Sequence, residues 1–483
     1  MNARTWPTLP AMLVIAAVLS GCAVGPDFQR PIPPAADRYV ADPLPIESPR
    51  GESSQHIVAG EPLRGEWWRQ FGSGALDRVV DRALASNRTL AAASATLAQA
   101  QELAAAQSGA LSPQVGLNAG VGREKYGAEF LGTSPKPPPF SYFAVGPTIS
   151  YALDYTGGIA RSVEQRVALA DFQRQQLHAA YLAVSGNAVL QALKIAALRA
   201  QIATVDAILD QDRENLKLVN VAFAAGSVSR LDIVTAQSQL ASDATSLPPL
   251  RRDLGVARHA LALVMGDPPA VAALPDFDLA QLTLPAELPL SLPSELAHRR
   301  PDILAAEAQL HAATAAVGVA NANRYPHINL SASSGQQAPD LGHLFDRASN
   351  VWSLAGALVA PLLDGGTLRA EQRAAVAALH VAEANYEQTV LAAFGQVADT
   401  LDGIAHGAEE LAAQARAQDA ALANVDLTRK SYNEGNVGVL QVLDAERLYQ
   451  QARVGYVRAQ AQRYIDTAQL YLALGGGIAD DAH

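Results

Sequence analysis

The segment Ser431–Leu448, SYNEGNVGVLQVLDAERL, interrupts a long helical tract with Gly435 and, three residues later, a second glycine. Glycine adopts the positive φ angles that reverse a chain at the end of a helix. The same pattern occurs earlier in the chain, because Phe223–Asp232 aligns with Tyr432–Gln441 at an offset of 209 residues (435 − 226). The sequence therefore predicts two helical hairpins, with their tips at Gly226 and Gly435.

Both hairpins are expected in proline-free tracts, one between Pro147 and Pro248 and one from Leu362 to the C-terminus. A seam of mostly apolar residues with alternating steps of four and three residues runs through the first tract: Leu177, Tyr181, Val184, Ala188, Gln191, Ile195, Leu198, Ile202, Val205 and Leu209. This spacing is typical of a coiled coil. A helix from about Gly158 to Phe223 would be roughly 100 Å long, which exceeds what a single globular core needs.

The repetition extends beyond the tips. Gly266 and Gly475 keep the offset of 209 residues, and SPQVGLNAGVG, which starts at Ser112, matches YPHINLSASSG, which starts at Tyr325. Self-similarity of this kind indicates two copies of one structural unit. We therefore expect residues 76–267 to form a first repeat of one helix, two strands and a long helical hairpin, 268–293 to form a proline-rich linker, and 294–483 to form a second repeat.

Each repeat also contains a pattern typical of β-strands. Apolar residues alternate with small or polar ones in four segments: Gln114–Val121, Tyr142–Leu153, Ile328–Ser333 and Trp352–Leu358. Strands of about ten residues suit a membrane-spanning barrel with a polar lumen, although a half-buried soluble sheet alternates in the same way. Aromatic residues near the strand ends favour the barrel: Tyr126, Phe130, Phe140, Tyr142, Tyr325 and Trp352. Four strands cannot close a barrel in lipid, where open edges leave backbone groups unpaired, so the barrel must be oligomeric.

The N-terminus has the features of a lipoprotein signal. Arg4 precedes a short apolar core, Ala11–Leu19, and Leu19–Cys22 is a bacterial lipobox that ends in the only cysteine of the chain. We expect residues 1–21 to be a signal peptide and residues 22–75 to be a lipidated, extended arm. A diacylglycerol and an N-acyl chain on Cys22 would hold the protein to a bilayer, whereas the alternative is an incidental buried thiol. Ala23 follows instead of aspartate, which favours the outer membrane of a Gram-negative bacterium.

The composition argues against other classes of protein. The net charge is −11 and no basic run is longer than a pair, which argues against a nucleic-acid partner. The ten histidines lack metal-binding spacing, and Gly475–Gly477 follows a terminal helix without the context of a phosphate loop. We therefore predict that the protein is not an enzyme, with a lipid-anchored periplasmic hydrolase as the alternative from that class.

Taken together, these motifs resemble the outer-membrane factor family of tripartite efflux systems, in its NodT-type lipoprotein branch of TolC- and OprM-like channels. The residues that carry the resemblance are Leu19–Cys22 with Ala23–Phe28, Trp67-Trp68 with Phe71-Gly72, Arg299–Ile303 with Ala305–Glu307 and Leu310, Tyr325-Pro326, Asp364–Gly366, and Tyr432 with Gly435 and Leu443–Ala445. The match covers essentially the whole chain.

The resemblance implies a mixed α and β membrane protein. Three chains would each give four strands to a 12-stranded transmembrane β-barrel, and their long helices would form a periplasmic coiled-coil barrel. It implies a passive exit duct for drugs or other small molecules, which works with a periplasmic adaptor and an inner-membrane pump, usually of the resistance-nodulation-division (RND) class. No cofactor is implied beyond the acyl chains on Cys22. The alternative is a pore-less periplasmic coiled-coil adaptor or scaffold lipoprotein.

The resemblance also assigns roles at the hairpin tips. Asp444, Asp232 and Tyr432 match family positions of a periplasmic gate, and the turns at Gly226 and Gly435 match the tips that contact the adaptor. Two positions depart from the family pattern: Gln441 replaces a second aspartate and Val437 replaces an arginine. The alternative for both aspartates is that they stabilise the first turns of their helices through the helix dipole. Arg299–Asp302 is expected to be structural, since Pro301 and Asp302 are favourable at the start of a helix.

Overall fold

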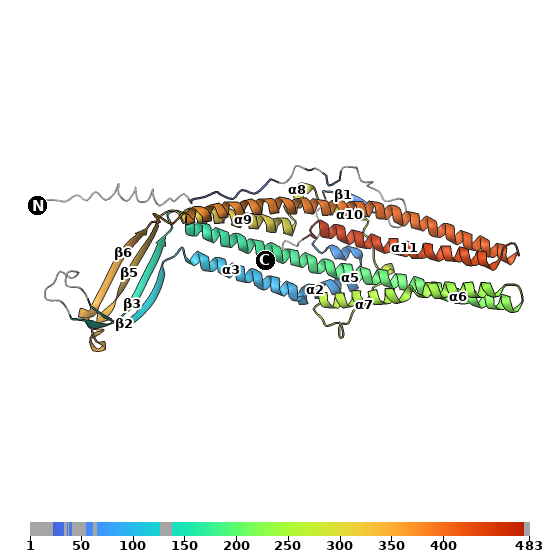
Figure 1. Cartoon of the computed structure of the whole chain (residues 1–483), viewed down its shortest axis with the longest axis horizontal. Helices are drawn as coiled ribbons and strands as arrows, with labels where there is room; N and C mark the ends of the chain where they lie inside the picture. Colours follow the sequence, from blue (N-terminus) through green and yellow to red (C-terminus); the bar gives the residue numbers. More distant parts are fainter. Residues whose placement is uncertain are drawn as a thin grey trace. The chain divides into compact units, whose positions relative to one another are not determined.

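The computed structural model describes residues 23–32, 36, 38–40, 55–60, 65–125 and 138–477. Cys22 and the aromatic residues Tyr126 and Phe130 lie outside these residues. The chain divides into two compact units (Figure 1). The strand unit contains Met1–Pro31, Thr96–Gln173 and Ala305–Tyr386, and the hairpin unit contains Ile32–Ala95, Arg174–Leu304 and Glu387–His483.

The helices and strands follow one another in an order that is used twice. They are β1 (His56–Ala59), η1 (Trp67–Phe71), α2 (Gly74–Ser86), α3 (Arg88–Gly109), β2 (Gln114–Glu124), β3 (Phe140–Leu153), α5 (Gly158–Ala224), α6 (Arg230–Ala244), α7 (Leu247–Val264), η2 (Leu279–Gln281), β4 (Glu287–Leu290), α8 (Pro293–Leu296), α9 (Pro301–Ala322), β5 (His327–Ala338), η3 (Leu341–His343), η4 (Arg347–Ser349), β6 (Asn350–Val359), α10 (Thr367–Asn433) and α11 (Val439–Ala473). Helices α5 and α10 each have 67 residues, and their starts differ by 209 (367 − 158). Helices α3 and α9 each have 22 residues, and their starts differ by 213 (301 − 88). The offsets found in the sequence are therefore also the offsets between equivalent helices.

The two repeats differ in the returning arm of the hairpin. Helix α11 is continuous, whereas α6 and α7, which start and end at the equivalent positions, are separated at Thr245 and Ser246. Pro248 and Pro249 lie in the first turn of α7. Proline has no N–H to donate and its ring clashes with the carbonyl of the preceding turn, so it is tolerated only where a helix begins. The break in the first repeat follows from these two prolines, which the second repeat lacks.

The strand unit contains an antiparallel sheet in the order β2-β3-β5-β6 (Figure 1). One row across the sheet is apolar: Val115, Ile149, Ala332 and Leu354. The neighbouring row is small and polar: Gly116, Thr148, Ser333 and Ser353. Because successive side chains of a strand point to opposite faces, the register confirms the predicted alternation of an apolar face and a polar face.

The two faces of the sheet have different surroundings. On the polar face, the Asn118 side chain donates to Thr148 Oγ1 at 2.9 Å, and the hydroxyls of Ser333 and Ser353 lie 2.8 Å apart. On the apolar face, Leu117 is 74% exposed and Leu354 is 77% exposed. The described residues therefore leave the apolar face of the sheet uncovered.

The core of the hairpin unit forms around η1. Trp67, Trp68 and Phe71 are buried there, and Trp67 stacks on Tyr471 of α11 with 5.5 Å between ring centroids. Gly72 ends η1 with a φ of 65°, and a Cβ at this position would lie 2.8 Å from Thr283 Oγ1. The Trp-Trp and Phe-Gly motifs of the sequence therefore build this core and the turn that leaves it.

Helix α9 begins at Pro301, as the sequence predicts. Arg300 pairs with Asp302 at 2.9 Å and donates to the carbonyl of Ala473, at the end of α11, at 2.8 Å. The structural interpretation of Arg299–Asp302 is confirmed. Helix α9 is also the one helix among the described residues that is long and apolar enough to cross a membrane, but Leu310 and Val317 in it are buried, as in a core helix.

Candidate gating and anchoring sites

The first hairpin tip joins α5 to α6 through a left-handed turn at Gly226. The φ angle of Gly226 is 75°, and its N–H donates to the carbonyl of Phe223 at 2.9 Å. The N–H of Ser227 donates to the carbonyl of Ala222 at 3.0 Å. These two bonds are those of a Schellman motif, which satisfies carbonyls that the end of a helix leaves free.

The second tip has the same geometry. Gly435 has a φ of 77° and donates to the carbonyl of Tyr432 at 2.9 Å, while Asn436 donates to the carbonyl of Ser431 at 2.9 Å. A Cβ built on Gly226 or Gly435 would meet no atom within 4 Å. Glycine is therefore required at both tips for its backbone angle and not for lack of space.

Asp232 lies in the first turn of α6 and binds the residue that begins the helix. The N–H and hydroxyl of Ser229 both donate to Asp232 Oδ2, at 2.7 and 2.8 Å. The bond from the backbone N–H, followed by that from the hydroxyl, lowers the pKa of Asp232. Ser229 and Asp232 form a capping box, in which the side chain of the third helical residue accepts a hydrogen bond from the backbone N–H of the cap residue.

Asp444 lies farther along its own helix, α11, and is much more accessible. Its side chain is 62% exposed and forms an ion pair with Arg447 Nη2 at 2.7 Å. Tyr432 is half-buried, and its hydroxyl makes no hydrogen bond to any residue that the structure describes. Asp232, Asp444 and Tyr432 are therefore near their respective tips but are not joined to one another by hydrogen bonds within the described residues.

A buried polar network, which was not predicted from the sequence, links the two hairpins. Gln450 of α11 donates to Asp212 Oδ1 of α5 at 2.8 Å, and Asn215 of α5 donates to Glu446 of α11. Arg429 of α10 pairs with Glu446 at 2.6 Å. Asp212 and Asn215 are three residues apart on α5, and Glu446 and Gln450 are four residues apart on α11. Each spacing places two polar side chains on one helix face, which is the sequence pattern that could have predicted the network.

This network is sensitive to the loss of any one member. Asp212, Asn215, Glu446 and Gln450 are each less than a tenth exposed. Removing one partner of a buried charge leaves the other unpaired, which costs several kcal/mol. The charge of Glu446 is balanced by Arg429, and the network therefore holds the two hairpins together through specific polar contacts. No group of His, Cys, Asp and Glu among the described residues is arranged to hold a metal ion.

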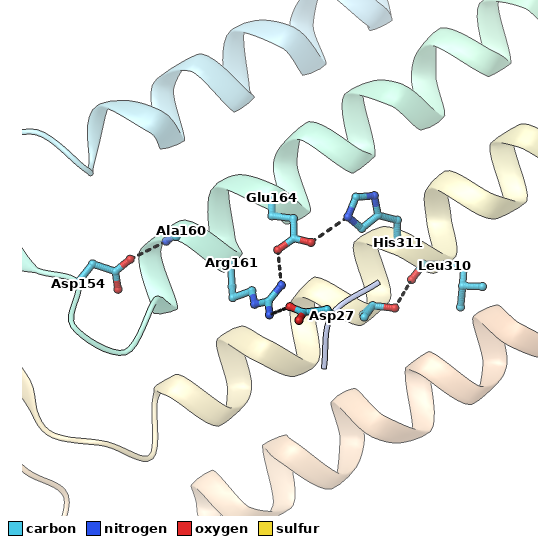
Figure 2. Close-up of polar contacts among 8 residues, drawn as sticks. Asp27, Asp154, Ala160, Arg161, Glu164, Leu310 and His311 are labelled. Atoms are coloured by element: carbon cyan, nitrogen blue, oxygen red, sulfur yellow. Dashed lines mark hydrogen bonds and ion pairs between the residues drawn. The ribbon is translucent and has the colours of Figure 1, made fainter. Parts of the chain in front are cut away.

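The arm that follows Cys22 is docked in the strand unit by a chain of polar contacts (Figure 2). Asp27 pairs with Arg161 of α5, which pairs with Glu164 at 2.7 Å, and Glu164 lies 2.9 Å from His311 Nε2 of α9. Phe28 stacks on the His311 ring with centroids 4.3 Å apart. The hydrogen bond to Asp27 raises the pKa of Arg161. Burial raises the pKa of Glu164, but hydrogen bonds from Arg161 and His311 outweigh it, so that pKa lies below its ordinary value.

Glycines allow the backbone of the arm to lie directly on the helices. A Cβ at Gly157 would lie 2.8 Å from Ala23 Cα. A Cβ at Gly318 of α9 would lie 2.8 Å from the Arg161 side chain and 3.1 Å from the carbonyl oxygen of Val24. The arm was expected to be extended, but its close docking was not foreseen. The residues directly after Cys22 are therefore held in place by α5, α9 and the turn before α5.

A sheet with an uncovered apolar face, together with long hairpins of helices, defines a subunit of an outer-membrane channel. Comparison with known proteins agrees. The model of the outer membrane efflux protein family matches residues 79–267 and 292–476, so the chain belongs to this family. It is 31% identical to the pyoverdine export outer membrane protein OpmQ of Pseudomonas aeruginosa over 91% of this chain and 94% of that protein.

Solved structures show the same fold. The outer-membrane channel OprN matches 95% of this chain and 100% of its own chain, with a TM-score of 0.86 and 28% identity. The open state of the MtrE outer membrane channel of Neisseria gonorrhoeae matches 96% of this chain and 100% of its own, with a TM-score of 0.81 and 26% identity.

The family and these structures confirm the main predictions. The fold is that of the trimeric channels, with a transmembrane β-barrel continued by a long helical barrel. The protein is an outer-membrane channel component of an efflux system, located in the outer membrane of a Gram-negative bacterium. The pore-less scaffold finds no support, and members of the family are efflux channels rather than enzymes.

Proposed function

We propose that the protein is the passive exit duct of a tripartite efflux system, in which three copies enclose one pore. The observation that carries this proposal is the open sheet. Among the described strands, β2 and β6 each have one unpaired edge. In lipid, each unpaired backbone group costs several kcal/mol, so the edges must pair with other copies. Three sheets of four strands give the 12 strands that the family resemblance implies.

The proposed partners are a periplasmic adaptor and an inner-membrane pump of the RND or another class. The tips at Gly226 and Gly435 are the proposed adaptor contact. Apolar side chains near the first tip support this role, because Leu231 is 68% exposed and Leu218 is 67% exposed. Exposed apolar groups of this kind favour contact with a protein partner. Drugs or other small molecules would reach the duct from the pump through this junction.

The proposed membrane anchor is a diacylglycerol and an N-acyl chain on Cys22. Docking of the next residues supports it, since Val24 donates to the carbonyl of Thr156 at 3.0 Å and Ala23 contacts Gly157. A fixed arm would keep the acyl chains beside the turn that follows strand β3. Several acyl chains bind a bilayer firmly, whereas one binds it only marginally.

The proposed gate lies at the hairpin tips. Asp444 is the carboxylate that is accessible enough to act on a permeating ion, and three copies of it would form one ring in the trimer. Asp232 would affect the gate indirectly, because its capping box fixes the start of α6 next to the first tip. The hydroxyl of Tyr432, which makes no hydrogen bond within the described residues, would bind a neighbouring chain. A ring of carboxylates attracts cations and opposes close approach of the chains unless it is partnered.

The assembly is tested by extracting the protein from outer membranes. We expect a β-rich trimer that is separated by heating in detergent and that conducts ions in a planar lipid bilayer. A monomer that becomes soluble once the acyl chains are removed would contradict the proposal and would favour the scaffold interpretation.

The gate is tested with Asp444→Ala in the same bilayers. We expect higher single-channel conductance or lower cation selectivity, because three negative charges leave the narrow part of the pore. Asp253→Ala, which removes an exposed carboxylate from α7, is the control and should leave both quantities unchanged. An unaltered pore in Asp444→Ala would leave this residue only the role of stabilising α11.

A further inference from the structure

Helix α3 is far less covered than α9, its counterpart in the second repeat. Of the 22 residues of α3, only Ala104 is buried, whereas α9 buries Ala312, Ala315 and Val317 among others. The two helices have the same length, and each directly precedes the first long strand of its repeat. The described residues of one chain therefore leave a face of α3 without a neighbour.

The open edges of the sheet indicate what covers this face. Within a chain, β3 pairs with β5, so that α5, which follows β3, lies beside α9, which precedes β5. Strand β2 is preceded by α3 and strand β6 is followed by α10, and each of these strands has one unpaired edge among the described strands. Pairing of β6 with β2 of a second copy would bring α10 beside α3 in the same way.

The contact between α5 and α9 supplies the register for such a pair of helices. A Cβ on Gly158 of α5 would lie 2.7 Å from the Cβ of Ala322 of α9. Farther along, Glu164 of α5 lies 2.9 Å from His311 of α9 (Figure 2). The two helices therefore run antiparallel, and the internal repeat converts each position on α5 to one on α10 by adding 209 and each position on α9 to one on α3 by subtracting 213.

The sizes of the residues change together at the equivalent positions. Gly158 and Ala322 correspond to Thr367 of α10 and Gly109 of α3 (158 + 209 and 322 − 213). The glycine has moved to the other helix, so one member of the pair again lacks a side chain. Within its own chain Gly109 needs no such freedom, because its φ is not positive and a Cβ would meet no atom within 4 Å. A close approach to Thr367 of the partner subunit accounts for this glycine.

A second pair of positions shows the same compensation. A Cβ on Gly318 of α9 would lie 2.8 Å from the side chain of Arg161 of α5. The equivalent positions are Ala105 of α3 and Ala370 of α10 (318 − 213 and 161 + 209). The residue on α3 is larger and the residue on α10 is smaller, so the two helices can still pack closely.

Opposite charges replace the polar contact between Glu164 and His311. Arg373 of α10 is equivalent to Glu164, and Glu102 of α3 is equivalent to Ala315, one turn from His311 on α9. Glu102 and Arg373 are both exposed and make no ion pair within the described residues. Ala315 is 0% exposed, so an equivalent neighbour would bury Glu102. A buried carboxylate is stable when a cation pairs with it, and Arg373 of the partner subunit supplies that cation.

We propose that α3 of one copy packs against α10 of the next copy in the register that α9 adopts on α5. In this contact Glu102 pairs with Arg373 of the partner subunit, and Gly109 faces Thr367 of the partner subunit. The inference rests on the proposed trimer and adds the residues that join neighbouring copies beside the strands. The contact occurs three times, once at each place where β6 of one copy meets β2 of the next.

Paired cysteines test the register in full-length protein from outer membranes. Gly109→Cys combined with Thr367→Cys should form covalent trimers on oxidation, because the two Cβ positions are adjacent across the interface. Gly109→Cys combined with Ala384→Cys is the control. Position 384 is exposed and lies 17 residues (384 − 367) farther along α10, a distance of about 25 Å, so this variant should give no covalent oligomer. Each single-cysteine variant controls for the native Cys22.

Charge reversal tests the ion pair independently. Glu102→Arg and Arg373→Glu should each lower the temperature at which trimers separate in detergent, because each places two like charges together. The double variant should recover most of this loss. Glu102→Arg combined with Arg416→Glu, which reverses an exposed charge elsewhere on α10, has the same net charge as the double variant and should remain as unstable as Glu102→Arg alone.

The outcomes separate this inference from the proposed function. Wild-type trimers that form normally, together with a Gly109→Cys and Thr367→Cys variant that gives no covalent trimer, overturn the register. A charge-reversed double variant that is no more stable than either single variant overturns the ion pair. Wild-type protein that forms no trimer contradicts the proposed function and removes this inference with it.

Discussion

The equivalent positions Asp232 and Gln441 show how a single residue alters one copy of the repeat. They are 209 residues apart, but only Asp232 has a carboxylate that accepts bonds from the cap residue Ser229. The second copy has Gly438 before α11, and glycine has no side chain that could cap the helix. An accessible carboxylate on the second hairpin is instead that of Asp444, three residues after Gln441. The two tips share a backbone turn but differ in how their charges are held.

The turn itself depends on the sign of φ at Gly435. Gly435→Ala should destabilise the second tip by about 1 kcal/mol, because a side chain in the left-handed region costs about that much although the space is open. Amide exchange of residues 431–436 should accelerate about fivefold. Gly403→Ala, within α10 and also in open space, is the control. It should stabilise its helix by up to about 1 kcal/mol, and equal effects of the two changes would refute the argument.

At the scale of elements, the long helices were predicted accurately. The helix expected from about Gly158 to Phe223 is α5, Gly158–Ala224. Periodicity and the absence of proline are local properties, so a sequence reports them directly. The break between α6 and α7 was not predicted, although Pro248 and Pro249 marked it. The docking of the N-terminal arm was also missed, because it depends on helices far away in the sequence.

The docked arm provides a prediction at this scale. Gly318→Ala would place a methyl group against Arg161 and Val24, so we expect the arm to detach, with a cost of about 1–3 kcal/mol from overpacking. Amide exchange and proteolysis of residues 23–30 should both increase. Gly395→Ala in α10, where a Cβ meets no atom within 4 Å, is the control and should leave the arm protected. Unchanged protection in Gly318→Ala would show that the arm is not held by this contact.

At the scale of the whole molecule, the sheet cannot be complete in one chain. Its apolar residues Leu117 and Leu354 are exposed, and its outer strands β2 and β6 have open edges within the described structure. Both deficits are removed when copies of the sheet join side by side in a bilayer. The strands, and not the proposed acyl chains, are therefore the elements that span the membrane.

This distinction predicts the effect of Cys22→Ser. Mass spectrometry of the mature wild-type protein should find a diacylglycerol and an N-acyl chain on its N-terminal peptide, and the variant should lack both. The variant should still form trimers that resist extraction by alkaline carbonate, because the barrel remains in the membrane. A wild-type N-terminal peptide that carries no acyl mass would exclude the lipid anchor, and release of the variant as a soluble monomer would contradict the role of the strands.

The sequence by itself determined the repeat, the long helices, the alternating strands and the positions of the hairpin tips. Each of these depends on residues close together in the chain or on a comparison of the chain with itself. Only the tertiary structure decided that Asp212 meets Gln450, 238 residues away, and that Asp27 meets Arg161, 134 residues away. Local spacing can mark a polar helix face, but it does not identify the partner, since a buried polar residue acquires its partner only when distant helices pack together. The physical reason is that backbone preferences are local, whereas the pairing of buried charges is a property of the folded molecule.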